Sequence, residues 1–310
     1  TITDQSGNSS LCFFDVTVND TEAPALNCTN LGAKTRFTAP GVCTYTVAGT
    51  EFNPLTFNDN CPGATLSNSF NGSNTLAGAV FPKGTTTVIW TVTDASGNTT
   101  TCTLVVTVND LQVPTITCPA NIVRNNDPNQ CGAIVTYAAP TFSDNCPGAT
   151  IMLVSGLPSG SFFPVGITTN VWKVTDAAGN MATCSFTVRV NDVQAPVFNN
   201  CPGNITKVND PGVCGAVVTW PKITASDNCP GVVVTFVSGM ASGSLFAVGT
   251  TTVVYKATDA SGNMATCSFN VIVIDNENPT LTCPADIVKN NDINKCSATV
   301  AFLGSPVASD

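Results

Sequence analysis

A six-residue motif that returns at regular intervals is the feature that most constrains this chain. TDASGN at 93–98 recurs as TDAAGN at 175–180 and TDASGN at 258–263, and a weaker copy, TDQSGN, lies at 3–8. Each copy is followed by a cysteine, an alternating apolar run and an Asp-containing linker that leads to a proline. Self-similarity of this kind indicates one structural unit repeated in tandem. The chain therefore divides into predicted repeats at 21–110, 111–192 and 193–275.

The two ends carry parts of the same pattern. Residues 1–20 correspond to the last hairpin of a truncated repeat, and residues 276–310 to the first two strands of a further one. Together they lack the middle of a repeat, so we read them as cut ends and not as halves of one exchanged domain.

The cysteines keep the same register. Each predicted repeat carries four, and the second and third repeats space them identically. No two are arranged as CxxC, which argues against a metal cluster and for disulfides formed in an oxidising compartment. The remaining three of the 15 are Cys12, the fourth of a preceding repeat, and Cys283 and Cys296, the first two of a following one. The predicted disulfide cysteines are Cys28, Cys43, Cys61, Cys102, Cys118, Cys131, Cys146, Cys184, Cys201, Cys214, Cys229, Cys267, Cys283 and Cys296.

Four cysteines allow three pairings, and their spacing alone does not choose between them. The first and second lie on strands expected to be antiparallel neighbours, and the third and fourth near one end of the domain. This topology favours pairing first with second and third with fourth.

The apolar pattern within a repeat has the period of strands. In 111–192 we expect about seven short strands separated by turns rich in Asn, Asp, Pro and Gly, and no segment holds a helical period. This predicts an all-β fold, a series of immunoglobulin-like sandwiches.

Phe186, Val188 and Val190 should face the core with Cys184, and Trp172 should meet them from the neighbouring strand. Trp90 and Tyr255 hold the place of Trp172. Phe70, Phe162 and Phe163 are the candidates for an exposed binding patch, although the last two could instead fill the sandwich.

Composition excludes several functions. The chain contains no histidine, so it lacks the usual general base and the commonest transition-metal ligand. A net charge of −9, without a basic cluster, argues against nucleic acid and anionic membranes as partners. The acidic residues sit in predicted turns and linkers and not in a cleft. We therefore expect no enzymatic activity, and no apolar run is long enough to insert into a membrane.

The ordered motifs of the second repeat resemble the hyalin repeat (HYR) family. They are TCPANIV, CGAIVTY, SDNCPG, FFPVG, TDAAGN and CSFTV, between Thr117 and Val188. The third repeat matches as well, whereas the first has NCTN at Cys28 and a longer middle. The resemblance covers nearly the whole chain. It implies an extracellular immunoglobulin-like module, found in tandem and linked to adhesion or matrix assembly, with no catalytic residues.

Oxygen-bearing side chains gather at three places in each repeat: the linker, the loop before the third cysteine and the last hairpin. In an immunoglobulin-like topology these places share one end of the domain, and such oxygens are the ligands that Ca²⁺ prefers. The alternative is that Asp and Asn only shape the turns through hydrogen bonds to their own backbone. The candidate calcium ligands are Asn19, Asp20, Asp59, Asp94, Asn109, Asp110, Asp144, Asp176, Asn191, Asp192, Asp227 and Asp259.

Three functions are consistent with this sequence. The leading one is a stalk or fibre segment of a secreted or cell-surface adhesin, in which short linkers keep the sandwiches in an extended, semi-rigid rod. The partners would then be neighbouring repeats of the same chain, or other copies in a fibre. The second is an array of modules that bind glycan or protein. The third is an accessory region of a secreted enzyme.

Overall fold

The computed structural model describes residues 1–309, and all of the regular secondary structure within them consists of β-strands. No helix within these residues is long and apolar enough to cross a membrane. The chain forms two compact units. The first comprises Thr1–Ala120, Tyr137–Pro158 and Thr169–Phe186, and the second Asn121–Thr136, Ser159–Thr168 and the chain from Thr187 onward. The boundary between the units therefore runs through the middle repeat, and each unit is described by itself.

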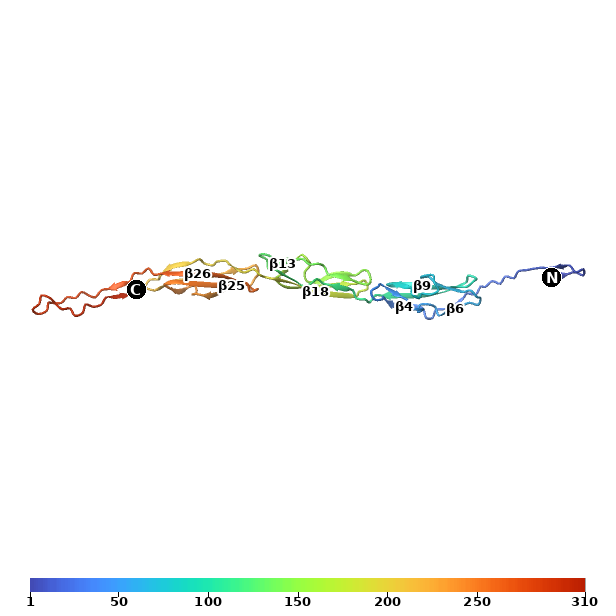
Figure 1. Cartoon of the computed structure of the whole chain (residues 1–310), viewed down its shortest axis with the longest axis horizontal. Coiled ribbons are helices and arrows are strands. Elements are labelled where there is room, and N and C mark those ends of the chain that lie inside the picture. Colours follow the sequence, from blue (N-terminus) through green and yellow to red (C-terminus); the bar gives the residue numbers. More distant parts are fainter. Residues whose placement is uncertain (310) are drawn as a thin grey trace. The chain divides into compact units, whose positions relative to one another are not determined.

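The first repeat is a two-layered sandwich within the first unit. Its main sheet has the order β4-β10-β9-β7, and two smaller sheets pair β3 with β6 and β5 with β8. Figure 1 labels β4, β6 and β9 in this repeat. The strands are β3 (Ala25–Asn27), β4 (Gly32–Phe37), β5 (Thr44–Thr46), β6 (Thr56–Asn58), β7 (Thr65–Asn68), β8 (Val80–Pro82), β9 (Gly84–Thr93) and β10 (Thr99–Asn109).

Alternation along the β9–β10 hairpin builds the core of this repeat. Val88, Trp90, Leu104 and Val106 are fully buried, while the residues between them are partly or wholly exposed. Because successive side chains of a strand point to opposite faces, this pattern turns one face of the sheet inward. The Trp90 indole donates from Nε1 to the Phe52 carbonyl, so its one polar atom is satisfied inside the core.

The middle repeat contributes strands to both units. In the first unit β11 (Thr115–Thr117) pairs with β14 (Thr141–Ser143), and β15 (Thr150–Ser155) pairs with β17. In the second unit β12 (Ile122–Asn125) pairs with β18, and β13 (Gly132–Val135) pairs with β16 (Ser161–Pro164). The long strands β17 (Gly166–Thr175) and β18 (Met181–Asn191) pass through both units.

This repeat has eight strands, so the expected seven were one too few. Most of the FFPVG segment belongs to β16; the chain bends at Val165, and β17 begins at Gly166, where φ is +118°. The first two strands are not antiparallel neighbours: β11 pairs with β14, and β12 lies parallel to β18.

The third repeat lies in the second unit and repeats the topology of the first. Its main sheet has the order β20-β26-β25-β23, beside the pairs β19–β22 and β21–β24. Figure 1 labels β25 and β26. The strands are β19 (Val197–Phe198), β20 (Ile205–Val208), β21 (Gly215–Val218), β22 (Ala225–Ser226), β23 (Val233–Ser238), β24 (Ser244–Ala247), β25 (Gly249–Thr258) and β26 (Met264–Ile274).

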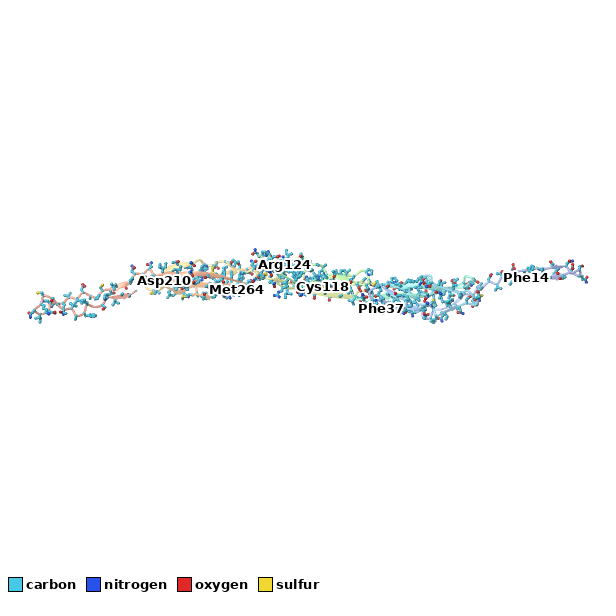
Figure 2. The ribbon with its side chains drawn as sticks, viewed as in Figure 1. Phe14, Phe37, Cys118, Arg124, Asp210 and Met264 are labelled. Carbon is cyan, nitrogen blue, oxygen red and sulfur yellow. A yellow bond between two sulfur atoms is a disulfide. The ribbon has the colours of Figure 1, made fainter. Side chains whose placement is uncertain are left out.

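The terminal segments hold short strand pairs. At the N-terminus β1 (Ile2–Thr3) pairs antiparallel with β2 (Ser9–Ser10). Phe14, labelled in Figure 2, follows this hairpin and is 83% exposed. At the C-terminus β27 (Thr280–Thr282) pairs with β28 (Val307–Ser309), which matches the pairing of β11 with β14 and not a pairing of the first two strands.

Most of the predicted core positions are buried. Phe186 in the first unit, and Val188 and Val190 in the second, are at most 2% exposed. Trp90 is fully buried, whereas Trp172 and Tyr255 are only partly so.

The three candidate aromatics for an exposed patch have different environments. Phe163 is fully buried, and Phe70 stacks on Phe81 at a ring-centroid distance of 4.4 Å. Phe162 alone remains substantially exposed. The three therefore form no shared patch.

Candidate functional site at the repeat junctions

The disulfides follow a staggered pattern that differs from the predicted one. Within each repeat the first cysteine pairs with the fourth: Cys28–Cys102, Cys118–Cys184 and Cys201–Cys267. The second cysteine of one repeat pairs with the third of the next, as Cys43–Cys146 and Cys131–Cys229. The expectation of first with second and third with fourth was wrong. Cys118 is labelled in Figure 2.

The strand topology explains the error. Cys118 directly follows β11 and lies beside β18, which carries Cys184, so these two sulfurs meet. Cys131 directly precedes β13, after a turn that faces the linker to the next repeat, and there it reaches Cys229. The second cysteine of a repeat therefore lies at the junction with the following repeat, and the third at the junction with the preceding one.

Among the described residues, five cysteines are not disulfide-bonded: Cys12, Cys61, Cys214, Cys283 and Cys296. The last four were expected in disulfides within their own repeats. Cys61 holds the third position of its repeat and Cys214 the second, so each occupies the place that forms an inter-repeat bond at the other junctions.

The last hairpin turn of each repeat is shaped by its Asp and Asn. The Asp176 Oδ1 atom accepts from the backbone amides of Ala178 and Asn180 at 2.8 Å, and Oδ2 accepts from the Asn180 side chain at 2.8 Å. Burial alone would raise the pKa of Asp176, but the hydrogen bonds from Asn180, Ala178 and Gly179 outweigh it and lower this pKa. The same bonds form around Asp4, Asp94 and Asp259.

The turn Asn also ties the hairpin to the linker. The Asn180 side chain donates to the Asp110 carbonyl at 3.2 Å, and the Asn263 side chain donates to the Asp192 carbonyl at the same distance. The amide nitrogen of this residue therefore holds the linker backbone, a role that its sequence position did not reveal.

The loop before the third cysteine packs against the same hairpin. Asp144 Oδ2 accepts from the Cys146 amide at 3.0 Å, which closes a tight turn, and Gly148 follows with φ of +102°. A Cβ atom at Gly148 would lie only 3.2 Å from that of Ala177, so glycine permits both the backbone conformation and the close approach.

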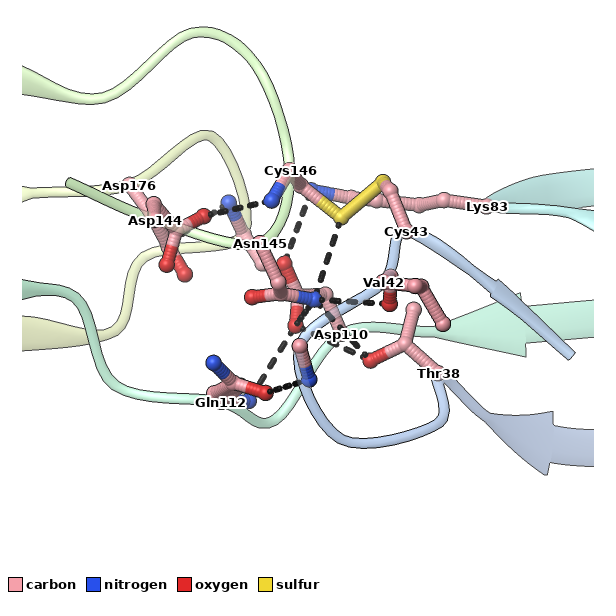
Figure 3. The surroundings of a disulfide bond; sticks show 12 residues. Thr38, Val42, Cys43, Lys83, Asp110, Gln112, Asp144, Asn145, Cys146 and Asp176 are labelled. Carbon is pink, nitrogen blue, oxygen red and sulfur yellow. Dashed lines mark hydrogen bonds and ion pairs between the residues drawn. A yellow bond between two sulfur atoms is a disulfide. The ribbon is translucent and has the colours of Figure 1, made fainter.

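The junction in the first unit is organised around Asn145 (Figure 3). Its side-chain nitrogen lies 3.2 Å from the Val42 carbonyl, 3.4 Å from Thr38 Oγ1 and 3.3 Å from Asp110 Oδ1. One amide thus joins the loop of one repeat, the linker and the disulfide region of the preceding repeat. The Lys83 ammonium lies 3.7 Å from Asp110 Oδ2, whose side chain is fully buried.

The junction in the second unit repeats this arrangement with different partners. The Asn228 side chain donates to the Gln130 carbonyl at 3.0 Å and to Asp192 Oδ1 at 3.2 Å. Here the Asn126 side chain accepts from the Val193 amide at 3.1 Å. Val165 stands at the sequence position of Lys83, because FFPVG replaces VFPKG.

A linker side chain that we had not singled out makes a recurring contact. Gln112 Oε1 accepts from the Gly41 amide at 2.9 Å, Gln194 Oε1 from the Asn129 amide at 2.9 Å, and Glu277 from the Gly212 amide at 3.0 Å. The three donors have φ of +77°, +58° and +69°. Each of these Gln and Glu residues stands two positions after the linker Asp, and this shared spacing could have identified them from the sequence.

The structure brings together only part of the predicted calcium set. One carboxylate oxygen each from Asp110, Asp144 and Asp176 lie within 4.8 Å of one another. Asp192 and Asp227 are equally close, and so are Asp20 and Asp59. Asn109 and Asn191 instead end strands β10 and β18, where Asn191 Oδ1 accepts from Arg189 Nε, and Asn19 is exposed.

Several oxygen atoms at these places are buried without a hydrogen-bond partner among the described residues. They recur at equivalent positions: the second carboxylate oxygen of the linker Asp and the first of the loop Asp. These atoms are Oδ2 of Asp20, Asp110 and Asp192, and Oδ1 of Asp59, Asp144 and Asp227, joined by Oδ1 of Asn145 and Asn228.

Similar proteins with curated descriptions include two called hyalin. The chain is 36% identical to hyalin of Strongylocentrotus purpuratus over 99% of its own length and 26% of that protein. It is 32% identical to hyalin of Lytechinus variegatus over 99% of its length and 58% of that protein. It also matches the serine-rich adhesin for platelets of Staphylococcus aureus, at 28% identity over 54% of this chain and 8% of that protein. The chain thus spans about a quarter of the first relative and somewhat over half of the second.

Among solved structures, the protocadherin gammaB4 extracellular domain overlaps 94% of this chain and 57% of its own, with a TM-score of 0.34 and 15% identity. Drosophila N-cadherin EC1-3 overlaps 79% of this chain and 98% of its own, with a TM-score of 0.33 and 12% identity. The sequence profile of the HYR domain matches residues 19–108, 109–190 and 191–273. With three successive HYR domains and two hyalins alike over nearly its full length, the chain belongs to the HYR domain family.

Proposed function

We propose that this chain is a non-catalytic structural segment of an extracellular adhesion or matrix protein, in which successive repeats are fastened to one another as a semi-rigid spacer. The observation that carries the proposal is the staggered disulfide pattern, because Cys43–Cys146 and Cys131–Cys229 each join one repeat to the next. A flexible linker would need no such bond.

The relatives support the adhesive or matrix role. They include two hyalins and an adhesin for platelets. Five disulfides in 310 residues support a secreted or cell-surface location, because such bonds persist in oxidising compartments.

Two measurements on the oxidised chain test this proposal. Peptide mapping without reductant should recover both inter-repeat disulfides. Small-angle scattering should give a particle that becomes more flexible when Cys43, Cys146, Cys131 and Cys229 are replaced by serine. A scattering curve that does not change with these replacements would show that the bonds do not set the stiffness, and a map without them would remove the basis of the proposal.

We further propose that Cys61 and Cys214 form inter-repeat bonds with flanking repeats. Gly212 donates to Glu277 as Gly41 does to Gln112, so the loop that carries Cys214 already meets its linker in the way seen at a bonded junction. Two thiols would lose two electrons and two protons to a disulfide oxidant such as glutathione disulfide. In a longer array, mapping should find both cysteines bonded to neighbouring repeats; free thiols after oxidation would contradict this.

A second candidate function is ligand binding by the third repeat. Phe236 and Tyr255, together with the mostly buried Trp220, line an open hollow of about 600 Å³, and the Phe236 and Tyr255 rings meet edge to face at 5.4 Å. Open aromatic surfaces of this kind suit the apolar faces of sugars. Glycan-array binding that is lost in Phe236→Ala, but kept in Phe162→Ala of the second repeat, would support this function. Equal binding by both variants would exclude the hollow as the glycan-binding site.

A further inference from the structure

The junction in the second unit carries negative charge that the protein itself does not neutralise. Asp192 is 7% exposed, and its Oδ2 atom has no hydrogen-bond partner among the described residues. The same holds for Asp227 Oδ1. The two side chains bring carboxylate oxygens within 4.8 Å of each other. Because a buried carboxylate is costly without a partner, a pair of them calls for a compensating charge.

Within residues 1–309, no lysine or arginine forms an ion pair with Asp192 or Asp227. Arg189 lines the neighbouring hollow, but its Nε atom donates to Asn191 Oδ1 at 3.0 Å. The hydrogen bonds that do reach the two carboxylates use their other oxygens: Asp192 Oδ1 accepts from Gln194 and Asn228, and Asp227 Oδ2 accepts from Cys229.

We propose that a divalent cation, Ca²⁺, binds at this junction with the Asp192 and Asp227 carboxylates as its protein ligands. Two ligands on one Ca²⁺, each at about 2.3–2.6 Å, lie up to about 5 Å apart, which matches the observed approach of the oxygens. Water completes the shell, and it enters through the open hollow of about 520 Å³ that Asp192 lines.

The chemistry of the site selects a hard cation. The Cys229 sulfur lies within the same 4.8 Å, but it is held in the disulfide with Cys131 and offers no thiolate. Without thiolate or imidazole, the site disfavours zinc and copper. The hairpin Asp259 is not required, because both of its carboxylate oxygens accept hydrogen bonds within its own turn.

The junction in the first unit provides an internal contrast. There Lys83 places its ammonium 3.7 Å from Asp110 Oδ2, the atom equivalent to Asp192 Oδ2. A resident positive charge competes with an incoming cation. The first junction therefore binds Ca²⁺ more weakly than the second, even though three carboxylates approach one another there.

Calorimetric titration of the oxidised 310-residue chain with calcium chloride tests the inference. We expect a dissociation constant on the order of 10⁻⁴–10⁻³ M, as in other extracellular modules. Asp192→Asn and Asp227→Asn should each weaken binding at least about tenfold by removing a charged ligand. Asp210→Asn is the matched control, since Asp210 pairs with Lys207 away from the junction, and it should leave binding unchanged.

Exchange of the lysine between junctions sharpens the test. Val165→Lys should weaken binding at the second junction, and Lys83→Val should add a second binding event. Thermal melts and disulfide maps of each variant show whether it remains folded. No heat of binding at millimolar calcium, or equal binding by the wild type and by folded Asp192→Asn and Asp227→Asn variants, would overturn the inference. Neither result would affect the disulfide map on which the spacer proposal stands.

Discussion

The two junctions share one set of contacts, called the junction frame below, but differ in the side chains around the linker Asp. Both have a disulfide, an Asn before the third cysteine that donates into the preceding repeat, and a linker Gln that accepts from a backbone amide. They differ around the linker Asp, where Thr38 and Lys83 contact Asp110 in the first unit and neither has a counterpart at Asp192. The recurring contacts are mostly to backbone atoms, so the junction frame tolerates changes in side chains while the charge at its centre varies.

Removal of an inter-repeat disulfide should have the largest effect. The bonds Cys43–Cys146 and Cys131–Cys229 close loops of 103 and 98 residues, so their loss should cost similar stability, about 2–5 kcal/mol each. Denaturant unfolding of the two double-serine variants measures this. If one variant were unaffected, the two junctions would not be mechanically equivalent.

Substitution of the junction Asn should come next. Asn145→Ala and Asn228→Ala each remove a donor that serves two or more acceptors, at a cost of about 1–3 kcal/mol. Asn145→Asp should be worse than Asn145→Ala, because it adds a carboxylate beside Asp110. Hydrogen exchange at the linker amides reports the loosening, and a milder effect of Asp than of Ala would contradict the assigned donor role.

Substitution of the left-handed residue in the loop before the second cysteine should have a smaller effect on stability. Gly41→Asn should be nearly neutral, because Asn129 already adopts this conformation, with φ of +58°. Gly41→Ala and Asn129→Ala should each cost about 1–2 kcal/mol. Melting temperatures of the three variants check the order, and equal losses for Asn and Ala at position 41 would show that conformation is not the cause.

The smallest effect should be a pH dependence at the hairpin of the first junction. The pKa of Asp176 is lowered in the folded chain, so its ionised form favours folding. This stability is fully present above the ordinary Asp pKa of about 3.9 and is lost as the pH falls through the lower folded value. Asp176→Asn should reduce the acid sensitivity of melting below about pH 4, where this contribution is lost. An unchanged pH profile would contradict this assignment.

Periodicity predicted the fold well. Alternation identified the long strands and the inward faces of Phe186, Val188 and Val190, and the repeated hairpin motif marked the turns. Strand neighbours were harder to predict, because which strands pair depends on long-range packing and not on local pattern. The parallel pairing of β12 with β18, and the strand inside FFPVG, both arise from that packing.

The location of the candidate site could be predicted from the sequence, but the role of each carboxylate in it could not. The sequence located the acidic residues at the junctions, yet it gave no way to separate Asp176, whose oxygens are used by its own turn, from Asp192, which keeps one oxygen unpaired. The disulfide pairing failed for a related reason. The expected pairing assumes self-contained repeats, whereas the loop that carries Cys131 turns toward Gln194 and the next repeat.

The bonds within each repeat have a consequence under tension. Cys28–Cys102, Cys118–Cys184 and Cys201–Cys267 join cysteines 74, 66 and 66 positions apart in the sequence. If a pulling force melts a sandwich, the residues between the paired cysteines remain shielded inside a closed loop and add no contour length. At about 3.3–3.6 Å per extended residue, each loop withholds more than about 200 Å of extension. An array built in this way would stretch very little when its domains unfold, and would transmit a load between its two ends at nearly constant length.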